Sequence, residues 1–132
     1  MKATELRIGN KFECMGMVQT VFEICDNTDR GKYKQKGYEH IIRCEENGNQ
    51  YKPIEISGIQ LTEEWLLKLG FVTCYDDYEG EVRQYIKYPI IWVASDHYRI
   101  YNQWCFDYEI KYVHQLQNLY FALTGKELKL KL

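Results

Sequence analysis

The sequence has no cysteine pattern that would bind a metal or support a set of disulfides. Its 132 residues include five cysteines, an odd number, and no two of them are separated by only two residues. A zinc knuckle needs two such close pairs, and a secreted disulfide scaffold uses an even number of cysteines. We therefore expect buried, reduced thiols and neither a metal site nor a cofactor.

Long apolar runs are also missing. No stretch approaches the roughly 18 apolar residues of a membrane-spanning helix. Residues 1–7 lack the apolar core of a secretory signal. These absences predict a soluble, cytoplasmic protein that has no membrane partner.

Neither charge sign is in large excess. The chain has 17 basic and 19 acidic residues, for a net charge of -2, and neither half is basic. A protein that binds duplex nucleic acid by neutralising phosphates needs a basic surface, so this class of function is not expected.

The common catalytic motifs are absent as well. We find no G-x-S-x-G, no H-E-x-x-H and no zinc-deaminase signature. The adjacent carboxylates Glu45–Glu46 and Asp76–Asp77 would point to opposite faces of a strand, so neither pair can clamp a metal ion. We expect no catalytic residue and no enzymatic activity.

The composition that is present predicts an α+β fold. Hydrophobic residues make up 45% of the chain and aromatic residues 15%, which is enough for a packed core. We expect a β-rich lobe at 1–60, resembling an SH3-like or small β-barrel. The second lobe, 61–132, should hold a short linking helix and an antiparallel sheet packed on a long C-terminal helix, and the two lobes should form one compact unit.

Turn and cap signals define these elements. Asn47-Gly48 is typical of a two-residue type I′ hairpin, which would pair Cys44 with Tyr51. Thr62 is a good N-cap for a helix that begins at residue 63. Gly125 would close the C-terminal helix. The apolar stripe of that helix is Val113, Leu116, Tyr120 and Leu123, and the alternation in 128–132 predicts a final strand.

One predicted sheet face combines aromatic and cationic residues. A hairpin turn at Ser95-Asp96 would pair Val93 with Tyr98 and Trp92 with Arg99. Such a face could stack a base and neutralise a phosphate. Alternatively, the long helix covers this face, Trp92 is part of the core and the cations lie at its rim. The six residues of the face are Arg83, Tyr85, Lys87, Trp92, Arg99 and Tyr101.

A glycine-flanked loop is a second candidate for anion or partner binding. Its four cations are Arg30, Lys32, Lys34 and Lys36. Gly31 and Gly37 would let the loop bend close to a phosphate or to an acidic partner. It does not match the Walker pattern, and the alternative is a solvated loop.

Aromatic residues in predicted loops favour an interaction surface. Tyrosine and tryptophan give a large contact area at low entropic cost. This composition favours a protein-binding surface or a homo-oligomer. The residues are Tyr33, Tyr38, Tyr75, Tyr78 and Trp104.

Three blocks resemble a family of small uncharacterised proteins from gut Bacteroidota and from their phages and mobile elements. The blocks are 3–10 (ATELRIGN), 59–71 (IQLTEEWLLKLGF) and 110–128 (IKYVHQLQNLYFALTGKEL). The resemblance implies an accessory gene and brings no functional residues. It favours an anti-defence protein in the host cytoplasm that sequesters a nucleotide-type immune signal. The alternatives are a protein–protein inhibitor of a host defence or regulatory protein and, third, a nucleic-acid-binding module.

Overall fold

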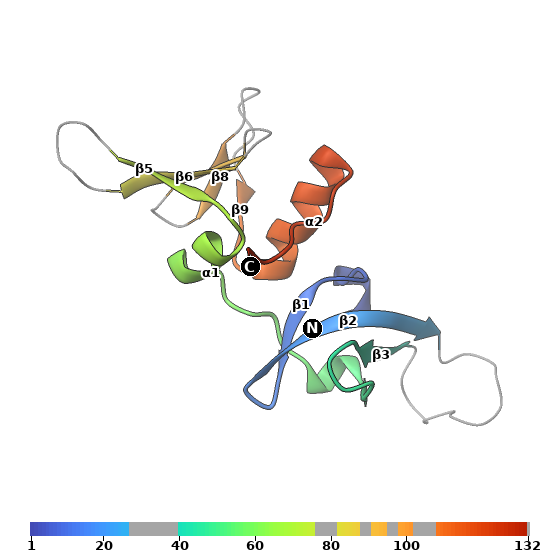
Figure 1. Ribbon diagram of the computed structural model, residues 1–132. Coiled ribbons are helices and arrows are strands. Elements are labelled where there is room, and N and C mark those ends of the chain that lie inside the picture. Colours follow the sequence, from blue (N-terminus) through green and yellow to red (C-terminus); the bar gives the residue numbers. More distant parts are fainter. Residues whose placement is uncertain (27–39, 76–81, 88–90, 95–97, 102–107, 132) are drawn as a thin grey trace. The chain divides into compact units, whose positions relative to one another are not determined.

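The computed structural model describes residues 1–26, 40–75, 82–87, 91–94, 98–101 and 108–131 (Figure 1). These residues form a mixed α+β structure, which confirms the predicted fold class. The chain divides into two compact units, Met1–Ile59 and Gln60–Leu132, called here the first and the second unit. The predicted lobe boundary lies one residue from this division.

The first unit is an antiparallel sheet with the strand order β1-β2-β3-β4. The β1–β2 hairpin turns through Met15 and Gly16, both with positive φ, as a tight two-residue turn requires. Its elements are η1 (Ala3–Glu5), β1 (Lys11–Cys14), β2 (Met17–Asp26), β3 (His40–Cys44), β4 (Gln50–Tyr51) and η2 (Pro53–Glu55).

An SH3-like or small β-barrel lobe was predicted, and the described part of the first unit is an open sheet in which no closed barrel forms. β2 is the longest of the described strands, and a register shift between Val21 and Glu23 separates its pairing with β1 from most of its pairing with β3. After η2, Ser57 pairs with Glu13 of β1 through two backbone hydrogen bonds of 2.9 Å. The last residues of the unit therefore return to its first strand.

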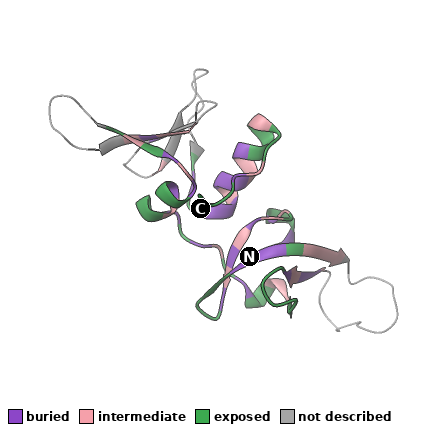
Figure 2. Cartoon of the chain, in the orientation of Figure 1, coloured by how far each residue is buried: buried purple, intermediate pink, exposed green. Residues whose placement is uncertain are grey.

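The core of the first unit is apolar and contains two thiols (Figure 2). Burial raises the pKa of Cys44 to about 11, and the charges of Glu46 and Cys14 act in the same direction. The predicted burial holds for Cys14 and Cys44, but Cys74 is exposed. The buried cluster consists of Ala3, Leu6, Phe12, Cys14, Val21, Ile42, Cys44 and Ile56.

The hairpin after β3 differs from its predicted register by two residues. Tyr51 pairs with Ile42 rather than with Cys44, and the Asn49 carbonyl accepts a 3.0 Å hydrogen bond from the Cys44 amide. The loop is longer because Glu46 turns back to β2, where its carboxylate accepts a 2.7 Å hydrogen bond from the Thr20 amide. This contact sets the register that the Asn-Gly pair alone does not determine.

A polar cluster of Lys11, Thr20 and Glu46 joins three segments of the first unit. The Thr20 hydroxyl donates to Glu46 and accepts from the Lys11 ammonium group, which lies 3.6 Å from the Glu46 carboxylate. Burial opposes ionisation of Glu46. The hydrogen bonds from Thr20 and the charge of Lys11 outweigh burial and hold the Glu46 pKa below its ordinary value of 4.5.

The lowered pKa of Glu46 predicts a loss of stability in acid. Above the ordinary pKa of 4.5, the ionised carboxylate stabilises the folded state, and this contribution is lost as the pH falls through the lower folded-state pKa. Glu46→Gln should therefore be destabilised near neutral pH and should approach the wild type in acid. Denaturant unfolding across this pH range measures the difference. Glu45→Gln is the matched control, and an equal pH dependence of Glu46→Gln and wild type would contradict the assignment.

The second unit combines a five-stranded antiparallel sheet, in the order β5-β6-β7-β8-β9, with two described α-helices. Lys87 of β6 lies 6.0 Å from the ring centroid of Tyr120 in α2, so helix and sheet meet there. The elements are α1 (Glu63–Lys68), β5 (Val72–Tyr75), β6 (Val82–Lys87), β7 (Ile91–Ala94), β8 (Arg99–Tyr101), β9 (Tyr108–Glu109) and α2 (Val113–Thr124).

The predicted helix caps are confirmed. The Thr62 hydroxyl accepts a 3.4 Å hydrogen bond from the Trp65 amide, and Gly125 adopts the left-handed conformation after α2. The predicted stripe of α2 is buried except at Leu123, which is half-exposed. Residues 127–131 form no strand, although Leu128 is buried. None of the described helices is long and apolar enough to cross a membrane.

Candidate functional site

The strand register separates the residues that were predicted to share one sheet face. Tyr85 pairs with Val93, whereas Ile86 pairs with Trp92. Because paired positions share a face and neighbouring positions alternate, Tyr85 and Trp92 occupy opposite faces of the sheet. Tyr85 and Val93 are 3% and 0% exposed, so their face is the buried one. The register therefore does not place all six residues on one face of the sheet.

Three of the six residues remain on one face. Trp92 pairs with Tyr101, which differs by two residues from the predicted pairing with Arg99. A shift of two keeps every residue on its face, so Trp92, Arg99 and Tyr101 still share the same side of the sheet. The predicted turn at 95–96 lies outside the described residues. Val72, in register with Ile86 on this side, is 63% exposed.

Lys87 has another position than predicted. The Lys87 ammonium group donates a 2.7 Å hydrogen bond to the Leu69 carbonyl at the end of α1. Burial lowers its pKa, and the charge of Lys131 adds to this effect. Arg83 is the extra residue where β6 shifts register against β5. Lys87 pairs with Ile91, so it lies on the face opposite to that of Trp92.

The other predicted surfaces lie largely outside the described residues. This applies to the whole cationic loop with Arg30, Lys32, Lys34 and Lys36. It applies equally to the predicted loop aromatics except Tyr75, which ends β5. Their roles stay predictions. Among the described residues, no three His, Cys, Asp or Glu side chains are grouped so that they could hold a metal ion.

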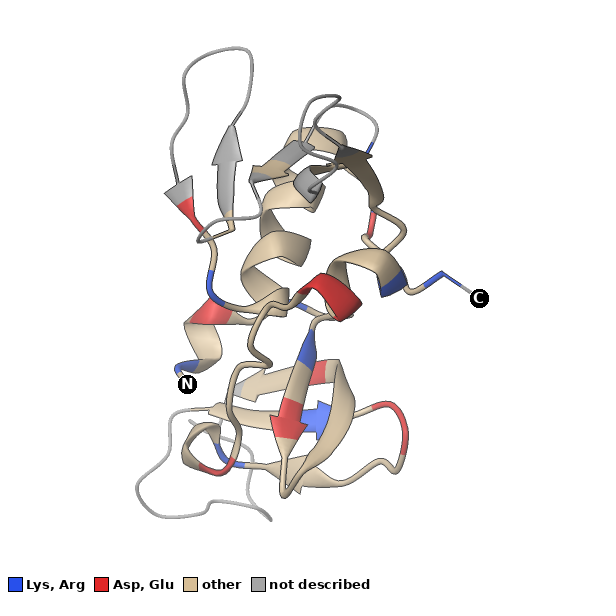
Figure 3. Ribbon diagram, turned by 90° about the vertical axis from the view of Figure 1, so that its left-hand side faces the viewer, with Lys and Arg blue, Asp and Glu red and all other residues tan. Residues whose placement is uncertain are grey.

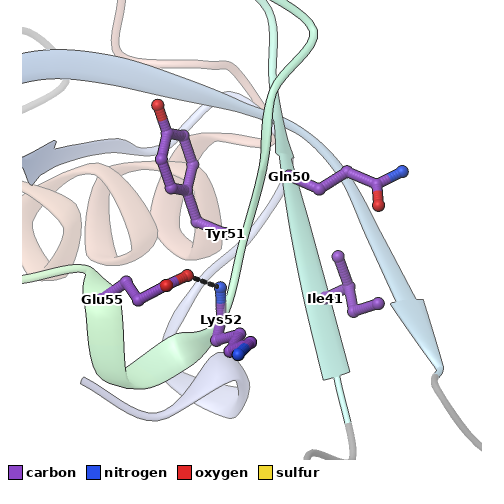
Figure 4. A pocket seen from close by; sticks show the side chains of 5 residues that line it. All are labelled: Ile41, Gln50, Tyr51, Lys52 and Glu55. Atoms are coloured by element: carbon purple, nitrogen blue, oxygen red, sulfur yellow. Dashed lines mark hydrogen bonds between the residues drawn. The ribbon is translucent and has the colours of Figure 1, made fainter. Parts of the chain in front are cut away.

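The described residues of the first unit form a pocket that is a candidate site (Figure 4). Ile41 comes from β3, Gln50 and Tyr51 come from β4, and the chain then enters η2. Its volume is about 180 Å³. The residues that line it are Ile41, Gln50, Tyr51, Lys52 and Glu55.

Local hydrogen bonds and ring packing hold the pocket walls in place. The Glu55 carboxylate accepts a 2.7 Å hydrogen bond from the Lys52 amide, which fixes the η2 turn that Pro53 begins (Figure 4). The Tyr51 ring packs edge-on against Phe12 at a centroid distance of 6.3 Å. Tyr51 is thus anchored to the core of the first unit.

The surface of the pocket is more polar than apolar. Ile41 is 8% exposed and supplies apolar surface, whereas Gln50 and Glu55 are exposed. Sites that enclose a drug-sized ligand usually occupy about 300–1,000 Å³, so this pocket is too small for a whole nucleotide. It can take one side chain from a binding partner, and Lys52 and Glu55 lie at its rim.

Comparison with known protein families, curated proteins and solved structures finds no match. The case for a function therefore depends on the geometry of the described residues.

Proposed function

We propose that this protein is a non-enzymatic binding protein that docks onto a host protein and uses the pocket of the first unit as an anchor. The carrying observation is the size of the pocket, which suits one side chain. Interfaces commonly concentrate binding energy in a buried side chain that fills such a pocket, surrounded by polar contacts. Ile41 and Tyr51 provide the apolar contact, and Lys52 and Glu55 provide the rim.

The arrangement of the first unit supports an SH3-like lobe as its finer fold. Four antiparallel strands follow one another, a short 3-10 helix comes after the fourth, and Ser57 then pairs with the first strand. This connectivity is that of a small, curled β-module. A fold does not determine a function, so the proposal depends on the pocket itself.

The resemblance to phage and mobile-element proteins supplies the biological context of the proposal. An accessory protein of this kind would act in the host cytoplasm as an inhibitor of a defence or regulatory protein. Inhibition by docking requires no catalytic group. A pocket that receives one side chain of the partner is sufficient to orient the partner on the surface.

Charge reversal at the rim tests this proposal. The wild type and two variants are used to isolate partners from host lysate, and the dissociation constant for each recovered protein is then measured. Lys52→Glu should weaken binding by about tenfold or more because it alters the pocket rim. Lys2→Glu is the matched control, since Lys2 is exposed in the same unit and does not line the pocket. Equal affinities of the two variants would refute the proposal.

Sequestration of a nucleotide signal is a second candidate. The observation that favours it is the common face of Trp92, Arg99 and Tyr101. Thermal unfolding with a panel of linear and cyclic nucleotides tests it directly. A nucleotide present at about 100 times its dissociation constant adds about 2.7 kcal/mol of stability. Unchanged unfolding across the panel would eliminate this candidate and leave the docking proposal intact.

A further inference from the structure

β5 is an edge strand whose solvent side is apolar. It lies at one end of the order β5-β6-β7-β8-β9, and β6 is its only strand partner among the described residues. Thr73 pairs with the buried Tyr85, so Val72 and Cys74 lie on the opposite face of the sheet. Val72 is 63% exposed, and Cys74 is exposed as well. This edge therefore presents backbone donors and acceptors beside exposed apolar side chains.

The other three edges of the two sheets, as far as the structure describes them, are protected against pairing. β1 contains Lys11 and Glu13, and Ser57 joins it through two backbone hydrogen bonds of 2.9 Å. β4 is two residues long and is closely followed by Pro53. β9 is also two residues long and includes Glu109. Charges, proline and short strands keep sheet edges from pairing with other chains, and β5, which is four residues long, has none of these features.

The charges on the two sides of β5 differ in sign. Figure 3 shows the acidic first turn and the basic last turn of α1, the helix that leads into β5. Lys68 ends this helix, and the Lys87 ammonium group donates a 2.7 Å hydrogen bond to the carbonyl of the next residue, so basic groups lie at the start of β5. In the sequence, Asp76 and Asp77 follow β5. An antiparallel second copy of this strand is therefore complementary in charge, because the start of each strand lies beside the end of the other.

We propose that the chain forms a symmetric dimer in which β5 pairs antiparallel with β5 of a second copy. The outer N–H and C=O groups of one strand then meet those of the other, as in the addition of a strand to a sheet edge. A pairing centred on Thr73 places Thr73 opposite Thr73 of the second copy and Val72 opposite Cys74 of the second copy. Threonine pairs and apolar pairs of this kind stabilise neighbouring strands. The dimer uses no residue of the pocket that is proposed for protein docking.

Sedimentation equilibrium of the full chain over a range of concentrations is the first test. A strand edge of four residues forms a small interface, so the dimer should be reversible and should gain population as the concentration rises. A chain that stays monomeric up to about 1 mM would overturn the inference.

A lysine in the edge locates the interface. Val72→Lys gives β5 the kind of charge that protects other sheet edges, and the exposed position allows the fold to be retained. The dissociation constant of the dimer should rise by about tenfold or more. Leu123→Lys adds the same charge at a half-exposed position of α2, so it is the matched control and should dimerise as the wild type does. Circular dichroism verifies the fold of both variants, and equal dissociation constants would overturn the placement.

Hydrogen exchange shows which chain occupies the edge. The amides of β5 should exchange more slowly at protein concentrations that favour the dimer than at concentrations that favour the monomer. A dimer in which the exchange of β5 does not change would have its interface elsewhere, and the inference would be wrong. Protection of β5 that requires an added host protein and is absent in the dimer would identify a different chain as the occupant and would also overturn the proposal.

Cross-linking tests the register of the paired strands. Val72→Cys places a new thiol opposite Cys74 of the second copy, at a separation that a disulfide can span. Oxidised glutathione should then link residue 72 of one copy to residue 74 of the other, and mass spectrometry of the linked peptides identifies the pair. Links that join only two Cys74 residues would overturn the pairing centred on Thr73.

Discussion

Replacing Phe12 with alanine is expected to lower the free energy of unfolding of the first unit by about 3–5 kcal/mol. Phe12 is 0% exposed and belongs to the buried cluster of this unit. Removing its ring leaves a cavity and also removes the edge-on contact with Tyr51. Because a unit of this size has only modest stability, the loss should unfold most of it. Denaturant unfolding, with NMR signals assigned to each unit, measures the effect.

Phe22→Ala is the matched control for this experiment. Phe22 is the same residue type in the neighbouring strand β2, but it is 54% exposed. Its replacement should cost less than about 1 kcal/mol. A similar loss in both variants would show that the buried cluster does not hold the first unit together. A milder variant, Phe12→Leu, should keep the fold and weaken partner binding, because Tyr51 loses its aromatic support.

Replacing Leu116 with alanine should destabilise the second unit by about 2–5 kcal/mol. Leu116 is 0% exposed and lies in the middle of α2, between the buried residues Val113 and Tyr120. The resulting cavity would weaken the packing of α2 against the core of the second unit. Circular dichroism during thermal unfolding measures the loss of the helix, and NMR identifies the unit that unfolds.

Leu123→Ala separates burial from helix propensity in the same experiment. Leu123 lies in α2 as Leu116 does, and it is 50% exposed. Both substitutions replace leucine with alanine in the same helix, so the difference between the two variants reports mainly burial. If Leu123→Ala destabilises the unit as strongly as Leu116→Ala, the burial pattern of α2 is not what stabilises the unit.

Local signals in the sequence predicted the helices well. Thr62 begins α1 and Gly125 ends α2 because capping is decided by groups within one turn of the chain. Leu123 was predicted to belong to the buried stripe because that stripe was extended to the last turn of α2, where Leu123 is half-exposed. Helical spacing alone does not show where the neighbouring core ends.

The two predicted hairpins failed in the same way, each with a register wrong by two residues. In the first, the Glu46 carboxylate binds the Thr20 amide of another strand, and this contact lengthens the loop beyond the Asn-Gly pair. A dipeptide preference contributes little against a charged hydrogen bond to a distant strand. Distant contacts of this kind cannot be read from local turn chemistry.

The candidate pocket could be predicted only in part. Asn47-Gly48 indicated the hairpin, and Pro53 indicated the end of a strand, but neither signal places Ile41 beside Glu55. That placement depends on the 3-10 turn closed by the Lys52–Glu55 hydrogen bond and on the packing of Tyr51 against Phe12. The residues predicted to form one aromatic and cationic face are separated for a related reason. No turn signal in the sequence specifies the register between β6 and β7.

The buried thiol of Cys44 makes the opening of the first unit measurable in real time. Only a thiolate attacks a disulfide reagent, and with a pKa raised to about 11 the Cys44 thiol remains protonated and enclosed in the folded unit. The exposed Cys74 of the second unit reacts without any opening. Slow labelling at Cys44 therefore reports how often, and for how long, the first unit exposes its interior, and a bound partner that stabilises this unit would lengthen the labelling time.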